Sequence, residues 1–273
     1  MISLRELPGR SYRRLRSIVE SGTRTLKDLQ WWRSAEGRKH RARLEGLRGL
    51  YRGRRCFVMG NGPSLKKVDF SLLRSEITIG SNAVYLIREE MGFQPTFLAV
   101  EDRLVAEDRA NELNTLSGTT KVFPRDLAYC ISADNNTIFV NCLRAYKPFP
   151  QFANDFAQKV FWGGTVTFFN LQLAYFLGCS EIYLIGIDHS YKVPPKEQIK
   201  NFVITSREDD PNHIHPDYFG KGYRWHDPNL ERMERSYRVA REFLDGKGVR
   251  VMNATVGGAL EVFERVEFAR LFA

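Results

Sequence analysis

Cys56-Phe57-Val58-Met59-Gly60-Asn61-Gly62-Pro63-Ser64-Leu65 is the stretch that decides the fold. A short apolar run breaks into two glycines and a proline, which predicts a strand, a tight turn and a helix start, because proline is tolerated in the first helical turn. Free backbone N–H groups at such a helix start, with Asn61 and Ser64, would form a cradle for phosphate oxygens. The turn lacks the Gly-Lys-Ser/Thr of a P-loop and the third glycine of a dinucleotide fingerprint. A purely structural turn therefore fits the same residues.

Short apolar runs recur after Arg54, alternate with helical stretches and mostly end on a polar residue. The runs are Ile77–Ser81, Thr96–Val100, Lys121–Phe123, Ile138–Val140, Glu181–Ile187 and Val249–Met252. This pattern predicts an α/β, Rossmann-like fold with a mostly parallel sheet flanked by helices, whose ligand lies at the carboxyl ends of the strands. The residues predicted to gather at that edge are Asn61, Asn82, Asp102, Asp188 and Asn253. Helix capping is the alternative role for any one of them.

A second glycine-rich helix start lies at Trp162-Gly163-Gly164-Thr165, ahead of the strongly apolar stretch Phe168–Leu177. Gly163, Gly164 and Thr165 can hold another part of the same ligand. Close packing of a helix on the sheet explains the glycines equally well.

The basic character of the chain belongs to its first 50 residues. They carry 13 Lys and Arg against 5 Asp and Glu, whereas the whole chain has a net charge of +9. Between Ser11 and Leu47 the apolar spacing is helical, so we expect a basic helical segment at 1–50 and a globular domain at 51–273. Such a segment can contact an anionic membrane surface through Trp31 or Trp32, or pack on the domain with its basic face in water. No recognition motif for nucleic acid accompanies the charge.

A chain of 273 residues with 43% hydrophobic residues can bury a sizeable core. Its four cysteines have no pair spacing, so reduced thiols are expected in place of disulfides or a metal site. We find no apolar stretch of membrane-spanning length and no signal-peptide core, which favours the cytoplasm, with the inner face of the membrane as an option.

A connection of nearly forty residues, 189–226, is dense in histidine, tyrosine and aspartate. Its aromatic content disfavours disorder, so we expect a lid over the carboxyl ends of the strands. His213, His215 and Asp217 can be read as metal ligands, although their spacing fits no standard zinc pattern. Alternatively, a histidine acts as general base while tyrosine hydroxyls stabilise a departing phosphate.

Three motifs in this order resemble the glycosyltransferase family 42 sialyltransferases and, equally, the MptE-like domain named for archaeal 6-hydroxymethylpterin diphosphokinase, which is also found in flagellin-glycosylating motility-associated factors. They are Gly60-Asn61-Gly62-Pro63-Ser64-Leu65, Ser81-Asn82 and Glu181-Ile182-Tyr183-Leu184-Ile185-Gly186-Ile187-Asp188. The closing run Asn253-Ala254-Thr255-Val256-Gly257-Gly258 also looks like the MptE-like group. The resemblance covers roughly residues 54 to 263 and implies that the domain at 51–273 is a nucleotide-binding transferase.

The resemblance implies that Asn61 and Asn82 bind the phosphate or ribose of a nucleotide and that Ser64 supports the first loop. It implies His226 as the catalytic base, because that histidine follows the lid and precedes a helix. Tyr191, near the family position but displaced from it, and Tyr218 or Lys221 would contact the leaving phosphate. Where the sialyltransferases have Arg-x-Thr-Ser-Gly, this chain has Val-Phe-Trp-Gly-Gly at 160–164, so a different donor sugar is expected.

Three hypotheses follow. In the first, the protein transfers a sugar from a nucleotide donor, CMP-linked by resemblance, to a glycan or glycoconjugate acceptor, with no certain cofactor. In the second, it transfers diphosphate from ATP to a hydroxymethylpterin, with Mg²⁺ on Asp102 and Asp188. The third is a non-catalytic nucleotide-binding module, for which a lid would be superfluous. The weak clustering of acidic residues favours the first, and a homo-oligomer is compatible with each.

Overall fold

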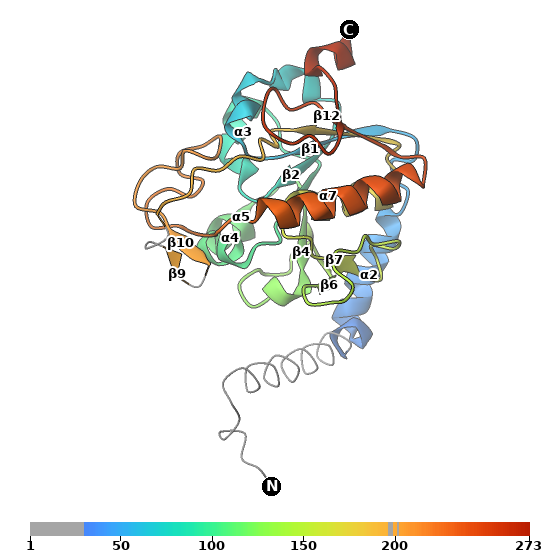
Figure 1. Cartoon of the computed structure of the whole chain (residues 1–273). Helices are drawn as coiled ribbons and strands as arrows, with labels where there is room; N and C mark the ends of the chain where they lie inside the picture. Colours follow the sequence, from blue (N-terminus) through green and yellow to red (C-terminus); the bar gives the residue numbers. More distant parts are fainter. Residues whose placement is uncertain (1–29, 196–198, 201) are drawn as a thin grey trace.

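The computed structural model describes residues 30–195, 199–200 and 202–273. Its centre is a sheet of eight strands in the order β13-β12-β8-β1-β2-β3-β4-β5, in which every neighbouring pair is parallel (Figure 1). The strands are β1 (Arg55–Met59), β2 (Ile77–Ser81), β3 (Phe97–Ala99), β4 (Thr120–Pro124), β5 (Thr137–Val140), β8 (Glu181–Ile185), β12 (Arg250–Asn253) and β13 (Glu264–Arg265). The predicted Rossmann-like α/β fold is confirmed.

The sheet is covered on both faces, which explains why its central strands are almost continuously apolar. Successive side chains point to opposite faces of a strand, so Cys56 and Val58 of β1 belong to one core and Phe57 and Met59 to the other. The helices described are α2 (Ala35–Leu47), α3 (Arg88–Met91), α4 (Arg103–Asp108), α5 (Ala110–Thr115), α6 (Val166–Phe176) and α7 (Leu230–Asp245). Of these, α2, α6 and α7 pack on the first face, and α3, α4 and α5 pack on the second together with short 3₁₀ turns.

The position of β1 creates the point where ligands bind in such folds. The chain runs from β1 to β5 in one direction along the sheet, whereas β8 and β12 lie on the other side of β1. The loops that follow β1 and β8 are therefore adjacent at the switch in strand order, where a crevice opens at the carboxyl ends. Gly60 and Gly62 join the loops by donating backbone hydrogen bonds to the carbonyls of Ile185 (2.8 Å) and Gly186 (2.9 Å).

The connection 189–226 folds in part as a small antiparallel sheet of β9 (Ile199–Lys200), β10 (Val203–Thr205) and β11 (Arg224–His226). It is fastened to the helical layer after β3. The Arg224 side chain pairs with Asp108, and the buried Arg109 donates to the carbonyls of Asp217 and Tyr218. These bonds hold the connection over the ends of the strands. A second small sheet pairs β6 (Cys142–Leu143) with β7 (Val160–Phe161).

The described part of the basic segment is integral to the first core. Leu44 of α2 is fully buried, His40 accepts a hydrogen bond from the backbone N–H of Phe139, and Arg43 donates to the carbonyl of Thr137. Trp32 is 5% exposed, and Trp31 packs edge-on against Phe139. These tryptophans contact the domain, as in the second of the two interpretations of the segment. The helical pattern predicted from Ser11 to Leu29 lies outside the described residues.

The cysteines and the membrane-spanning potential of the helices can also be compared with the predictions from the sequence. All four cysteines are free, with Cys56 and Cys179 buried and Cys130 and Cys142 partly buried. Within the described ranges, we find no helix both long enough and apolar enough to cross a membrane.

Leu44→Ala should lower the free energy of unfolding by about 2–5 kcal/mol, because it leaves a cavity where α2 packs on the sheet. Leu50→Ala is the matched control, since Leu50 is 53% exposed and its truncation should change stability by no more than about 0.5 kcal/mol. Chemical denaturation of both variants measures the difference. Equal stability of the two would mean that α2 does not belong to the core.

Candidate functional site

A cavity of about 620 Å³ lies at the carboxyl ends of β1, β2, β3 and β8. Its walls are the loops after those strands, the glycine-rich turn before α6, the connection 189–226 and the start of α7. The sequence-predicted residues that line it are Gly60, Asn61, Gly62, Asn82, Asp102, Gly164, Thr165, Asp188, Tyr191, Tyr218 and His226. Segments far apart in the sequence thus meet in one space.

Three predicted binding residues, Ser64, Gly163 and Asn253, do not line the cavity. Asn253 is 1% exposed and is bonded within its own turn, where Nδ2 donates to the Leu260 carbonyl at 2.8 Å. A Cβ on Gly163 would lie 2.3 Å from the ring of Phe168, so packing against α6 requires the glycine. Gly163 and Asn253 were predicted to contact the ligand. In the structure they instead support the backbone around the cavity.

The predicted phosphate cradle after β1 is filled by the protein's own carboxylate. Asp188 accepts hydrogen bonds from the hydroxyl of Ser64 at 2.5 Å and from its backbone N–H at 3.3 Å. The N–H groups of Gly60 and Gly62 are bonded to β8 and the loop after it, and a Cβ on Gly62 would lie 1.9 Å from Asp188 Oδ2. The expectation of free amides is thus wrong for Gly60, Gly62 and Ser64, because Asp188 and the β8 loop already use them.

Asn61 and Asn82 present unsatisfied oxygens at the cavity. The Oδ1 atom of each is buried and has no hydrogen-bond partner among the described residues. Asn82 has a positive φ of 48°, a conformation that asparagine tolerates better than most side chains, directly after β2. A buried carbonyl oxygen without a donor is costly, so both positions suit a ligand that brings N–H or O–H groups.

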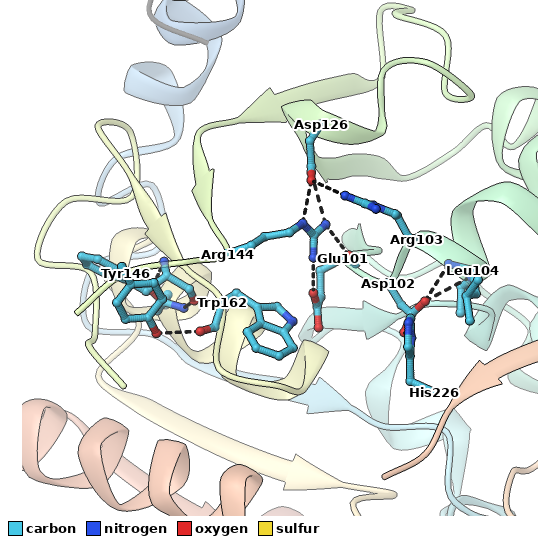
Figure 2. Close-up of polar contacts among 12 residues, drawn as sticks. Glu101, Asp102, Arg103, Leu104, Asp126, Arg144, Tyr146, Trp162 and His226 are labelled. Carbon is cyan, nitrogen blue, oxygen red and sulfur yellow. Dashed lines mark hydrogen bonds and ion pairs between the residues drawn. The ribbon is translucent and has the colours of Figure 1, made fainter. Parts of the chain in front are cut away.

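His226 and Asp102 form a hydrogen-bonded pair at the cavity wall, with 2.7 Å between Nδ1 and Oδ2 (Figure 2). The hydrogen bond that His226 donates to Asp102 raises the pKa of His226 above 6.5, although partial burial opposes the shift. Burial works to raise the pKa of Asp102, but its bonds to His226 and to the backbone N–H groups of Leu104 and Val105 outweigh it and lower that pKa. Asp102, as the N-cap of α4, thus holds one ring nitrogen and leaves Nε2 to accept a proton.

A buried charge network adjoins this pair and was not predicted. Arg144 lies 3.2 Å from Glu101 Oε2 and 2.6 Å from Asp126 Oδ2, and Arg103 reaches Asp126 at 3.9 Å (Figure 2). Burial raises the pKa of Glu101 to about 7, against the opposing effect of Arg144. Arg144 follows the two-residue strand β6 and is marked by no motif, so only the fold brings it to the cavity.

Two tyrosines of the connection 189–226, Tyr191 and Tyr218, line the cavity. Burial raises the pKa of Tyr218 and of Tyr191, so both hydroxyls stay protonated at neutral pH. His213 stacks on the Tyr218 ring with centroids 4.0 Å apart and bonds to Asp210 at 2.6 Å, which holds the tyrosine in place. The exposed Lys221 lies outside the cavity.

The predicted magnesium ligands do not fit that role. Asp102 is engaged by His226 and the α4 amides, and Asp188 is engaged by Ser64. Over the ranges that the structure describes, no group of three or more His, Cys, Asp or Glu side chains is arranged to hold a metal ion. The suggested set His213, His215 and Asp217 is also dispersed, because His213 bonds to Asp210 and His215 accepts from the Asp217 N–H.

Residues 34–194, more than half of the chain, match the family described as 6-hydroxymethylpterin diphosphokinase MptE-like. The chain belongs to this family. The match includes the loops after β1, β2, β3 and β8, and it ends before His226 and α7. No curated protein matches the chain in sequence.

Two solved structures are similar to this MptE-like chain. One is the MAf glycosyltransferase from Magnetospirillum magneticum AMB-1, with 14% identity, a TM-score of 0.47 and coverage of 89% of this chain and 42% of that one. The other is the sialyltransferase CstII from Campylobacter jejuni in complex with a substrate analogue, cytidine-5'-monophosphate. It has 15% identity and a TM-score of 0.43, and the match covers 79% of this chain and 85% of that one. This chain thus spans less than half of the Magnetospirillum protein, and at these identities neither similarity assigns an activity to it.

The pKa of His226, measured by NMR titration, should lie above 6.5 and should fall in Asp102→Asn. The pKa should fall because the carboxylate of Asp102 favours the charged imidazolium of His226, whereas the uncharged amide of asparagine does not. Glu267→Gln is a control, because Glu267 is exposed and pairs with Arg270 near the C-terminus. An unchanged His226 pKa in Asp102→Asn would contradict the assigned pair.

Proposed function

We propose that this MptE-like protein is a transferase that moves a glycosyl group from a nucleotide-activated sugar to a hydroxyl group of a glycan or glycoconjugate acceptor. One observation carries the proposal. A histidine held by a carboxylate lies on the wall of a cavity at the strand-order switch, which is where nucleotides bind in this class of fold. A non-catalytic binding module would have no use for that pair.

The donor is proposed to be CMP-linked. The unpaired oxygens of Asn61 and Asn82 can accept hydrogen bonds from ribose hydroxyls and from an exocyclic amine such as that of cytosine. Aromatic rings in the same cavity, among them Trp225 and Phe219, provide apolar surface for a base or a sugar. These features support a nucleotide occupant.

In the proposed reaction His226 Nε2 takes the proton of the acceptor hydroxyl while the oxygen of that hydroxyl forms a bond to the anomeric carbon of the donor. The bond between that carbon and the phosphate oxygen breaks, and the nucleoside phosphate leaves with the electron pair. Hydroxyl groups of Tyr191 and Tyr218, kept protonated by their raised pKa values, can donate to the leaving phosphate. Asp102 holds the imidazole and stabilises its protonated form.

The family description favours one alternative, the transfer of diphosphate from ATP to a hydroxymethylpterin. Such a reaction normally uses Mg²⁺ to hold the phosphates, and the carboxylates predicted for it are bonded to His226 and Ser64. We rank it second for that reason. A thermal-shift panel with CMP, CDP, UDP and ATP separates the two, because a ligand that binds the folded state raises its apparent stability. Stabilisation by ATP alone would favour the alternative.

The setting of the reaction is likewise proposed. A cytoplasmic enzyme would meet nucleotide sugars where they are made, and the basic residues of 1–50 would bring it to the inner membrane face and to lipid-linked acceptors. A homo-oligomer is compatible with this arrangement, and no nucleic-acid partner is proposed.

His226→Ala should reduce turnover about 100- to 10,000-fold while nucleotide affinity stays unchanged, because it removes the proton acceptor and no nucleotide contact. His215→Ala, in the same connection but outside the cavity, is the matched control and should retain activity. Steady-state kinetics and calorimetry measure the two properties. Near-normal turnover of His226→Ala would disprove its role as base.

The turnover of the wild type should rise with pH through the raised pKa of His226, because only the neutral imidazole can accept a proton. In Asp102→Asn this limb should move to lower pH, and the maximum turnover should fall as the ring loses its partner. A pH–rate profile of the two proteins tests the shift. A limb at the same pH in both would assign the titration to another group.

Asn61→Ala and Asn82→Ala should each weaken nucleotide binding about tenfold without unfolding the protein, since each removes a hydrogen-bond acceptor at the cavity and little core volume. Asn253→Ala serves as the contrast. It breaks the buried turn after β12 and should lower stability while sparing affinity. Calorimetry and thermal melting distinguish these outcomes, and unchanged affinity in both cavity variants would remove the nucleotide from this place.

A further inference from the structure

Arg232, on the first turn of α7, is a cation of the cavity without a carboxylate partner. Three arginines line the cavity, and the other two are compensated: Arg144 pairs with Glu101 and Asp126, and Arg103 pairs with Asp126. Among the described residues, Arg232 makes no ion pair, and its Nε atom is buried without a hydrogen-bond partner. A buried guanidinium N–H left unbonded is costly, so the position suits an anionic ligand.

The guanidinium is held in place by an aromatic platform. Its central carbon lies 4.8 Å from the centre of the Trp162 ring, which also lines the cavity. Stacking on an aromatic face leaves the N–H groups at the edge of the guanidinium free to form a fork with phosphate oxygens.

The platform is itself fixed to the fold. The carbonyl of Trp162 accepts a hydrogen bond of 2.6 Å from the hydroxyl of Tyr146 (Figure 2). One turn beyond Arg232, Ser236 donates to the carbonyl of Gly163 at 2.7 Å, which fastens the turn before α6 to α7. The arginine and its platform are therefore positioned before any ligand arrives.

Gly164 provides the room for this arrangement. It has a positive φ of 84°, and a Cβ there would lie 2.7 Å from Nε of Arg232. The glycine-rich turn thus contributes to the site by making space for a cation from another element, in addition to any contact of its own.

We propose that Arg232, stacked on Trp162, is the cation that binds the phosphate of the nucleotide. The inference deepens the proposed function and rests on it, since it names the cation for the charge that the transfer leaves on the nucleoside phosphate. It also replaces the predicted cradle after β1, whose amides are already bonded to Asp188 and to carbonyls of β8 and the loop after it. The oxyanion recognised is a phosphate because every nucleotide-activated donor carries one next to the bond that breaks.

Calorimetric titration of CMP, UMP, AMP and GMP, each beside its nucleoside, tests the proposal. For the nucleotide that the wild type binds most tightly, Arg232→Gln should lose about 10- to 100-fold in affinity, whereas affinity for the matching nucleoside should not change. Arg232→Lys should lie between, because a lysine retains the charge but not the planar fork. Raising the salt concentration should weaken nucleotide binding to the wild type more than to Arg232→Gln.

Arg238→Gln is the matched control, because Arg238 lies on the same helix, is 65% exposed and pairs with Glu234 outside the cavity. It should bind nucleotide like the wild type, and thermal melting checks that each variant is folded. Equal nucleotide affinity in folded Arg232→Gln and the wild type would overturn the phosphate assignment and leave the proposed function standing. Failure of the wild type to bind any of the four nucleotides would overturn both.

Discussion

The contact between the loops after β1 and β8 is the constraint on which the rest of the site depends. Gly60 and Gly62 approach the β8 loop so closely that a Cβ at either would overlap its atoms, and Asp188 closes the contact by bonding to Ser64. This contact fixes the positions of the two loops at the switch in strand order. These loops form the floor of the cavity. The backbone N–H of Ser64 is bonded to Asp188, and those of Gly60 and Gly62 are bonded to carbonyls of β8 and the loop after it. Because these amides are already used, the proposed phosphate needs a cation from another element.

The charged groups of the cavity lie in two places, near the end of β3 and near the turn before α6. Near the end of β3, Asp102 is bonded to His226, and Glu101 is paired with Arg144, so this wall carries the proposed base and compensated charges. Near the turn before α6, Arg232 stands unpaired on Trp162. The proposed reaction places the donor phosphate at Arg232 and the acceptor hydroxyl at His226, both of which line the cavity.

Much of the fold could be predicted because strand burial and turn residues are local properties. The apolar runs that end on polar residues mark six strands of the sheet closely, and the glycines and Pro63 mark the turn after β1. His226 was identified by its place between the connection 189–226 and α7, aided by the family resemblance. Asp102 follows a strand in the sequence pattern, but its bond to His226 depends on the pairing of β11 with the rest of the connection next to α4.

The sequence alone determined the parallel sheet, the edge at which its cavity lies and the residue types available there, because side-chain periodicity encodes which strands are buried on both faces. Only the tertiary structure decided which polar residues face the cavity and which are already satisfied. Asn253 is bonded within its own loop, and Asp188 is bonded to the hydroxyl and the backbone N–H of Ser64. Arg232, from α7, has a buried Nε without a hydrogen-bond partner. Such outcomes depend on competition among groups far apart in the chain for the same hydrogen-bond partners. A local sequence pattern does not show which group forms the bond.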